Sequence, residues 1–209
     1  MTSRIILVRH GESEGNAAGV LQGRMDYALS ELGRRQAALT AQRLADSGAY
    51  QVLSSPLTRA STTAALIAER LDLRLRLEPD LAEYDIGHAS GLTPAELRER
   101  FPEVMKARGA GERLRFPGEE GRDVFHVRIQ EALARMTEVQ GTTIAVAHGG
   151  VISAICHMVV GLDVHRPGAF HVGNCSLTEL QPDRTGALVI HRHNDTCHLA
   201  DLATFVDRG

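Results

Sequence analysis

The chain places a histidine directly after its first apolar segment. Residues 5–8 are all apolar, which is the pattern of a buried strand, and the tripeptide 9–11, centred on His10, follows at once. A neutral imidazole at the end of such a strand is a competent nucleophile. His148 comes directly after another buried-strand pattern, at residues 143–147. These histidines predict chemistry at one edge of a sheet.

Arg59 occupies the same kind of position. His10, Arg59 and His148 each lie in the short connection between the carboxyl end of an expected strand and the next expected helix. Ligands bind at that edge in open α/β sheets, so residues far apart in sequence can face one crevice. Arg59 also lies near a helix N-terminus, where free N–H groups and the helix dipole favour a phosphate. We therefore expect these side chains to share one crevice.

Strands and helices alternate along most of the chain. Ser30 is a suitable N-cap for a helix of small apolar residues that Gly48 would stop. Further helices are expected at residues 58–71, 125–136 and 151–160, the last closed by Gly161, and further strands at 50–53, 71–77, 175–180 and 188–193. This alternation predicts a three-layer α/β/α sandwich with a mostly parallel central sheet, whose edge is formed by the last pair of strands.

Residues 85–120 differ from the rest because glycines and prolines break them into short pieces. Thr93 and Glu96 form a capping box, with Pro94 at the first helical position. We interpret this region as a small helical cap inserted in a single domain of residues 1–209. Its basic residues suit either a solvated helix face or an anionic substrate; they are Arg98, Arg100, Lys106, Arg108, Arg113 and Arg115.

The composition excludes several classes of partner. With 209 residues, of which 43% are apolar, the chain is long enough for one well-packed domain. A net charge of −3 gives no general argument for binding nucleic acid or an anionic membrane, and no apolar run has the length of a membrane span. The cysteines Cys156, Cys175 and Cys197 are too few for a disulfide framework. We expect a cytoplasmic protein without a nucleic-acid or membrane partner; a homodimer is left open.

Several segments together resemble the histidine phosphatase superfamily, in its phosphoglycerate mutase-like branch. They occur in matching order between Ile5 and about Leu199, and they are Arg9-His10-Gly11, Glu12-Ser13-Glu14-Gly15-Asn16, Ser54-Ser55-Pro56-Leu57-Thr58-Arg59-Ala60, Leu81-Ala82-Glu83 and Ala147-His148-Gly149-Gly150. The resemblance implies that His10 forms a covalent phosphohistidine, which water later cleaves. It implies a small phosphorylated molecule as substrate and no cofactor or metal.

The resemblance also assigns a phosphate pocket. Arg9, Arg59 and His148 match its charged groups, where two guanidinium groups and an imidazolium would neutralise the charge on the transferring phosphoryl group. Asn16 matches a side-chain donor to the same oxygens. Other matching positions near the phosphate are Gln22, Gly23 and Gly149.

Glu83 matches the family's proton donor, which protonates the ester oxygen and then deprotonates the attacking water. Asp85 lies two residues further on and could compete for that role. The Leu-x-Glu context favours Glu83. The alternative for either carboxylate is that it only balances the charge of the arginines.

The chain departs from the family pattern in the cap. Many relatives have Trp-Glu before the glycine that is Gly91 here, whereas this chain has Ala89 and Ser90, which predicts a roomier or more polar substrate pocket. The stretch Pro117-Gly118-Glu119-Glu120-Gly121 replaces the common Pro-Gly-Gly-Glu-Ser, which leaves substrate contacts from that loop in doubt. Glu119 and Glu120 are expected to cap the next helix electrostatically.

Three alternatives stay open beside hydrolysis. Mutases of the family carry a lysine in the stretch that corresponds to residues 84–93, and this chain lacks it, which favours a hydrolase. A binding module without activity would usually lack one of the working residues. A zinc site is the third alternative, formed by His191, His193, Cys197 and His198. The sequence predicts a phosphomonoester hydrolase of the histidine acid phosphatase type, metal-independent and acting on a small anionic metabolite.

Overall fold

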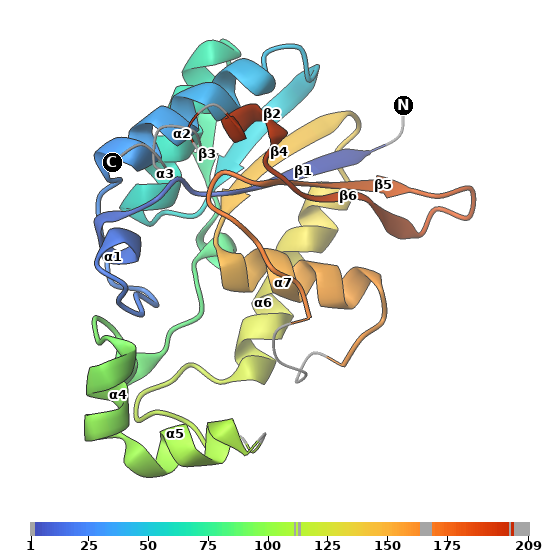
Figure 1. The fold of residues 1–209 in the computed structure, drawn as a ribbon. Helices are drawn as coiled ribbons and strands as arrows, with labels where there is room; N and C mark the ends of the chain where they lie inside the picture. The colour runs from blue at the N-terminus through green and yellow to red at the C-terminus, as the bar shows by residue number, and fades with distance from the viewer. Residues whose placement is uncertain (1–2, 111, 113, 164–168, 201, 203–209) are drawn as a thin grey trace.

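A six-stranded mixed sheet forms the centre of the computed structural model, which describes residues 3–110, 112, 114–163, 169–200 and 202. The strand order is β3-β2-β4-β1-β5-β6 (Figure 1). The parallel strands are β1 (Arg4–Arg9), β2 (Ala49–Ser54), β3 (Leu75–Leu77) and β4 (Thr142–Ala147). The antiparallel strands are β5 (Leu177–Pro182) and β6 (Leu188–Asp195).

Helices cover both faces of the sheet, which confirms the predicted three-layer α/β/α sandwich (Figure 1). The helices of one face are α2 (Glu31–Arg43) and α3 (Thr58–Arg70), and those of the other are α6 (Arg122–Thr137) and α7 (Gly149–Val159). Side chains alternate along β1, because Ile6 and Val8 pack with the first pair of helices while Ile5 and Leu7 pack with the second. Within the described part of the chain, no helix is long and apolar enough to cross a membrane.

The helix ends predicted at Ser30 and Gly161 agree with the structure. The Ser30 hydroxyl accepts a hydrogen bond of 3.0 Å from the Gly33 N–H at the start of α2. Gly161 follows the C-cap of α7 with a left-handed φ of +67°, which glycine adopts most easily. Gly48 does not end α2, because the helix already stops at Arg43 with Leu44 as its C-cap. Local capping chemistry therefore predicts the start of α2 and the end of α7, two of the helices that cover the sheet.

Two strand predictions were wrong. The strand expected at residues 71–77 covers only Leu75–Leu77, because α3 continues to Arg70, Leu71 caps it, and Asp72 takes a left-handed φ of +53°. The alternating leucines at residues 71–77 therefore span the end of a helix and a short edge strand. The last pair of strands does not form the edge together: β5 lies between β1 and β6, so only β6 is at the edge.

The segment expected as a cap contains α4 (Pro94–Arg100), α5 (Pro102–Gly109) and the 3-10 helix η2 (Gly87–Ala89). The capping box is present, with the Thr93 N–H donating to Glu96 Oε2 at 2.8 Å and the Glu96 N–H donating to Thr93 Oγ1 at 3.3 Å. These elements have an apolar cluster of their own, formed by Ala89, Leu92, Leu97 and Phe116. An antiparallel bridge between Leu21 and Leu92 joins them to the loop after β1. In Figure 1, α4 and α5 lie at the lower end of the view, away from the strands, and α1 (Glu14–Ala17) is the short helix above α4.

Candidate active site

A pocket of about 330 Å³ opens at the carboxyl ends of the parallel strands. It contains most of the residues that the sequence assigns to a phosphate site, although they come from distant parts of the chain. The lining residues are Arg9, His10, Asn16, Val20, Leu21, Gln22, Gly23, Arg59, Glu83, Tyr84, Ile86, Gly149 and Gly150. His148 is not among them, but its ring centroid lies 5.1 Å from that of His10.

His10 is held in the tautomer that a nucleophile needs. Its Nδ1 lies 2.7 Å from the Gly11 carbonyl oxygen. Because a carbonyl can only accept, Nδ1 carries the proton of the neutral ring and Nε2 keeps a free electron pair. Burial, together with the positive charges of Arg9 and Arg59, holds the pKa of His10 well below its ordinary value. The ring is therefore neutral at physiological pH and can attack.

The backbone around His10 is fixed on both sides. The His10 N–H donates to the Ala147 carbonyl of β4 at 3.0 Å, and the His10 carbonyl accepts from Asn174 Nδ2 at 3.1 Å. Gly11 approaches the start of α2 so closely that a Cβ there would lie 2.5 Å from the Gly33 carbonyl oxygen. A side chain at position 11 would push the histidine out of place.

The guanidinium groups of the pocket are held by neutral acceptors. Arg59 is 1% exposed, and its terminal nitrogens each donate at 2.8 Å, Nη1 to the Met25 carbonyl and Nη2 to the Gly23 carbonyl. Arg9 Nη1 donates to the Val172 carbonyl at 2.6 Å. Desolvation lowers the pKa of both arginines, yet they stay charged because guanidinium begins from such a high value. Carbonyls orient these cations without neutralising them, so their positive charge stays available in the pocket.

His148 is fully buried, with Nε2 lying 2.8 Å from the Ser55 hydroxyl oxygen. Burial and the nearby His10, Arg59 and Arg9 hold the pKa of His148 well below its ordinary value. The imidazolium expected at this position would therefore need a negative charge beside it to offset the cost of burial. A phosphate dianion beside the ring would supply that offset.

Amide groups complete the pocket wall. The Asn16 Oδ1 atom accepts from the Ser13 N–H at 3.1 Å, which leaves its NH₂ group as the donor. The Gln22 Oε1 atom accepts from the Ser13 hydroxyl at 2.8 Å, which likewise leaves the NH₂ group of Gln22. Gly23 has a left-handed φ of +51°, and its carbonyl is one of the acceptors that hold Arg59. Asn16 and Gln22 therefore offer side-chain donors to the anion that the arginines attract.

Glu83 and Asp85 point to different surroundings. The Glu83 carboxylate accepts from the Tyr84 N–H at 2.8 Å through Oε1 and from the Gly150 N–H at 3.0 Å through Oε2. It lines the pocket, whereas the Asp85 carboxylate accepts from the Gly87 N–H at 2.9 Å and lies outside the lining. A Cβ at Gly150 would lie 2.4 Å from Glu83 Oε1, so glycine at this position lets the carboxylate approach the start of α7. The geometry favours Glu83 as the proton donor.

The departures in the cap act differently from what the sequence predicts. Ala89 is fully buried in the apolar cluster of the cap and does not line the pocket, so it does not directly enlarge it. The Glu119 side chain is fully buried and accepts from the Tyr84 hydroxyl and from Arg108 Nη2, the latter at 3.1 Å. Glu120 bonds to the Arg128 side chain of α6 and not to the N–H groups at the start of that helix, and α6 has no side-chain cap. Neither glutamate therefore caps α6 through a hydrogen bond, and the expected electrostatic effect on the helix stays a prediction.

The described basic residues of the cap do not line the pocket. Arg113 lies outside the described residues, and none of the others lines the pocket. Arg108, for example, donates to Glu119. The cap's positive charge is therefore not part of the described anion site.

The histidines near the C-terminal end also have separate partners. His193 Nδ1 lies 3.2 Å from Thr178 Oγ1, and His198 Nε2 lies 3.0 Å from Thr40 Oγ1. Among the described residues, the structure gathers no group of three or more histidine, cysteine, aspartate or glutamate side chains that could hold a metal ion. The alternative of a zinc site at His191, His193, Cys197 and His198 finds no support there.

Several contributors were missed in the sequence. Ser55 belongs to the segment around Arg59 that carries the family resemblance, but the resemblance assigns it no role. Asn174 precedes β5 without any motif around it. The apolar side of the pocket comes from Val20, Leu21, Tyr84 and Ile86. Only their three-dimensional neighbours reveal these roles, because no spacing rule connects them to His10.

Comparisons with known proteins agree with this geometry. The family model described as "Histidine phosphatase superfamily (branch 1)" matches residues 5–196. A probable phosphoglycerate mutase GpmB of Yersinia pestis is 33% identical over 207 residues, with 94% of each chain covered. A mycobacterial glucosyl-3-phosphoglycerate phosphatase in complex with VO3 has a TM-score of 0.83 and 29% identity, covering 93% of this chain and 100% of that one. A phosphoserine phosphatase of Entamoeba histolytica has a TM-score of 0.81 and 28% identity, covering 94% and 98%.

Proposed function

The chain belongs to the histidine phosphatase superfamily, and from that premise we propose that it hydrolyses a phosphomonoester of a small metabolite through a covalent phosphohistidine at His10. The observation that carries the proposal is the hydrogen bond from His10 Nδ1 to the Gly11 carbonyl. It leaves Nε2 as a free nucleophile beside two charged guanidinium groups. Such a nucleophile suits a dianionic phosphoryl group, which repels negatively charged attackers.

The pocket provides each group that the reaction needs. The phosphoryl dianion binds between Arg9 and Arg59, and His10 Nε2 forms a bond to phosphorus as the bond to the ester oxygen breaks. Glu83, in its acid form, gives its proton to the departing oxygen. The resulting Glu83 carboxylate takes a proton from water, which attacks the phosphohistidine and releases phosphate. His10 returns to its neutral state.

Positive charge for the transition state comes from side chains in this proposal. Arg9 and Arg59 face the equatorial oxygens, and His148 becomes protonated when the dianion arrives. The enzyme is accordingly proposed to be metal-independent and to need no cofactor. Two of its three free cysteines, Cys156 and Cys175, are buried, in keeping with the proposed cytoplasmic setting.

Phosphate release from a panel of phosphorylated metabolites, measured with a chelator present, tests the proposal. We expect turnover of one or a few compounds by the native protein, and loss of that turnover by at least about 1,000-fold in His10→Ala. His191→Ala is the matched control, because His191 is an exposed histidine of β6 outside the pocket. Equal turnover in the native and His10→Ala proteins would refute the phosphohistidine.

Phosphoglycerate mutase chemistry is the second candidate, because the Yersinia relative carries that name. A mutase would bind substrates whose carboxylate adds negative charge to the phosphate. Among the described lining residues, Arg9 and Arg59 are the only arginine or lysine side chains, and both are used by the phosphoryl group. Incubation with 3-phosphoglycerate and 2,3-bisphosphoglycerate distinguishes the candidates: a mutase forms 2-phosphoglycerate, whereas the proposed hydrolase does not.

A further inference from the structure

The predicted proton donor lies outside regular secondary structure. Glu83 follows the 3-10 helix η1 (Pro79–Leu81) in an extended stretch that leads to the cap. Such a stretch has no ladder or helical hydrogen bonds of its own to fix it. A carboxyl group that must transfer a proton within hydrogen-bond reach therefore needs support from elsewhere.

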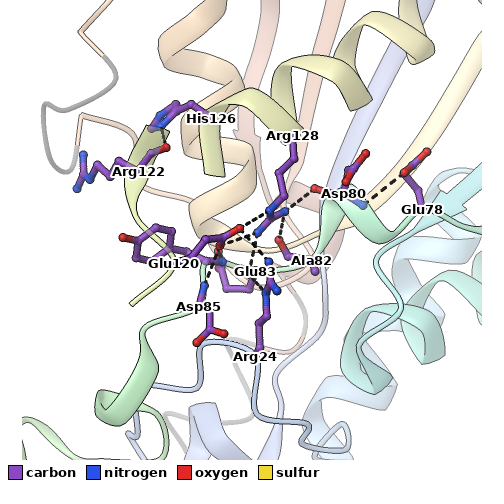
Figure 2. A network of polar contacts seen from close by, with 11 residues as sticks. Arg24, Glu78, Asp80, Ala82, Glu83, Asp85, Glu120, Arg122, His126 and Arg128 are labelled. Carbon is purple, nitrogen blue, oxygen red and sulfur yellow. Dashed lines mark hydrogen bonds and ion pairs between the residues drawn. The ribbon is translucent and has the colours of Figure 1, made fainter. Parts of the chain in front are cut away.

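Arg128 of α6 gives that support. Its Nη1 donates to the carbonyls of Asp80 at 2.5 Å and Ala82 at 2.7 Å, and its Nη2 donates to the Glu83 carbonyl at 3.0 Å. Figure 2 shows the guanidinium reaching from the helix onto this stretch. A planar, five-donor group is suited to hold several acceptors at once. The backbone on both sides of Ala82 is thereby tied to a rigid helix.

Glu120 holds Arg128 in turn. Its Oε1 accepts from Arg128 Nε at 2.7 Å and its Oε2 accepts from Arg128 Nη2 at 3.1 Å, which makes a bidentate ion pair. Both side chains are largely buried, with 12% of Arg128 and 8% of Glu120 exposed. The same carboxylate accepts from the Asp85 N–H and from Arg24 Nη2 (Figure 2). Although burial opposes it, the hydrogen bonds and positive charges lower the pKa of Glu120, so the carboxylate stays charged.

We propose that Arg128 and Glu120 are positioning residues for the Glu83 acid, a role that rests on the proposed function. Neither lines the pocket, so neither touches the substrate. They hold the Glu83 backbone at the distance at which its carboxyl can reach the ester oxygen. Because Glu120 belongs to the loop between the cap and α6, the same pair links the placement of the cap to the placement of the acid.

The acidity of the leaving group distinguishes a positioning role from a merely structural one. Benzyl phosphate releases an alcohol that must be protonated as it leaves, whereas p-nitrophenyl phosphate releases a stable phenolate and needs little help from an acid. The value of kcat/KM reports only the steps up to release of the alcohol. It is therefore sensitive to the acid function of Glu83 and not to its later function as a base.

Arg128→Gln is the first variant. We expect kcat/KM for benzyl phosphate to fall about 100-fold, the order of magnitude of general acid catalysis, and kcat/KM for p-nitrophenyl phosphate to fall no more than about 5-fold. Glu120→Gln keeps the size of the side chain and weakens its hold on Arg128. It should show the same selectivity with a loss of about 10-fold for benzyl phosphate.

Arg135→Gln is the matched control. Arg135 lies on the same helix and bonds to Glu78 and Asp80, but it does not reach Ala82 or Glu83. It should leave both kcat/KM values unchanged. Equal losses on both substrates in Arg128→Gln and Glu120→Gln, or no loss, would overturn the positioning role. A native protein inactive on both substrates and on the metabolite panel would instead overturn the proposed function and this inference with it.

Discussion

The floor and the roof of the pocket are built in different ways. The floor consists of Arg9, His10, Arg59 and His148, which stand at strand ends and are oriented largely by backbone carbonyls and one hydroxyl. The roof carries Glu83 and Tyr84. It depends on ion pairs and hydrogen bonds between loops.

We relate this difference to two functions of the pocket: the floor would carry the phosphoryl chemistry, and the roof would select among substrates. The floor uses neutral acceptors, so its positive charges stay available for a phosphoryl group. The roof uses paired charges such as Arg128 with Glu120 and Arg108 with Glu119, which fix loop positions and cancel one another. We infer that changes in the floor affect every substrate alike, whereas changes in the roof alter the preference among substrates.

Arg59→Lys should have the largest effect. A lysine amine cannot bond to the Gly23 and Met25 carbonyls and also present a flat pair of donors to the phosphate. We expect kcat/KM to fall about 1,000-fold, by a similar factor for every substrate. Steady-state kinetics on p-nitrophenyl phosphate and benzyl phosphate checks this; a selective loss on one of them would contradict a common floor.

Gly150→Ala tests the place where floor and roof meet. Its Cβ would lie 2.4 Å from Glu83 Oε1, so the carboxylate must move away from the start of α7. A shift of this size costs about 100-fold on a substrate that needs the acid and less on p-nitrophenyl phosphate. Gly109→Ala is the control for a glycine substitution, since no atom lies within 4 Å of the added Cβ and its φ is not left-handed.

Glu119→Gln should change preference more than rate. The buried carboxylate ties Arg108 and the Phe116 N–H of the cap to Tyr84 in the pocket wall. Loss of its charge loosens that wall. We expect the ratio of kcat/KM values between two substrates that differ only in the alcohol to change about 10-fold, with kcat for p-nitrophenyl phosphate kept within about 3-fold. An unchanged ratio would show that Tyr84 does not select the alcohol.

The smallest effect concerns pH and stability. The folded state holds the pKa of His10 and of His148 below the unfolded value, so the unfolded chain binds more protons as the pH falls below about 6.5. Stability should decrease from pH 7 to pH 5.5, by at least about 3 °C in Tm. Inorganic phosphate should reduce this decrease, because it favours protonated His148. Thermal unfolding of the native protein and of His148→Gln checks it: the variant should depend less on pH.

Sequence patterns were sufficient where local rules decide the outcome. His10, Arg59 and His148 could be placed together because strand ends of a parallel sheet share one edge. Ser30 marked the start of α2 and Gly161 the end of α7 because caps are local. The family resemblance added Glu83, and the structure places its carboxylate in the pocket beside Gly150.

The roof could not be predicted in this way. Arg128 lies on a helix and reaches carbonyls 45 to 48 residues earlier in the chain, a contact that no periodicity encodes. Glu119 and Glu120 precede α6, which is where helix caps occur, but their carboxylates pair with Arg108 and Arg128 instead. Ala89 belongs to the apolar cluster of the cap, which only the packed structure reveals.

The most direct test of the account is a burst experiment with Glu83→Gln and p-nitrophenyl phosphate. This substrate needs no acid for the first step, whereas cleavage of the phosphohistidine needs the Glu83 carboxylate as base. The account predicts release of about one p-nitrophenol per active site, followed by slow turnover, with the phosphoryl group found on His10 by mass spectrometry. Steady turnover without a burst, or a phosphoryl group on another residue, would contradict it.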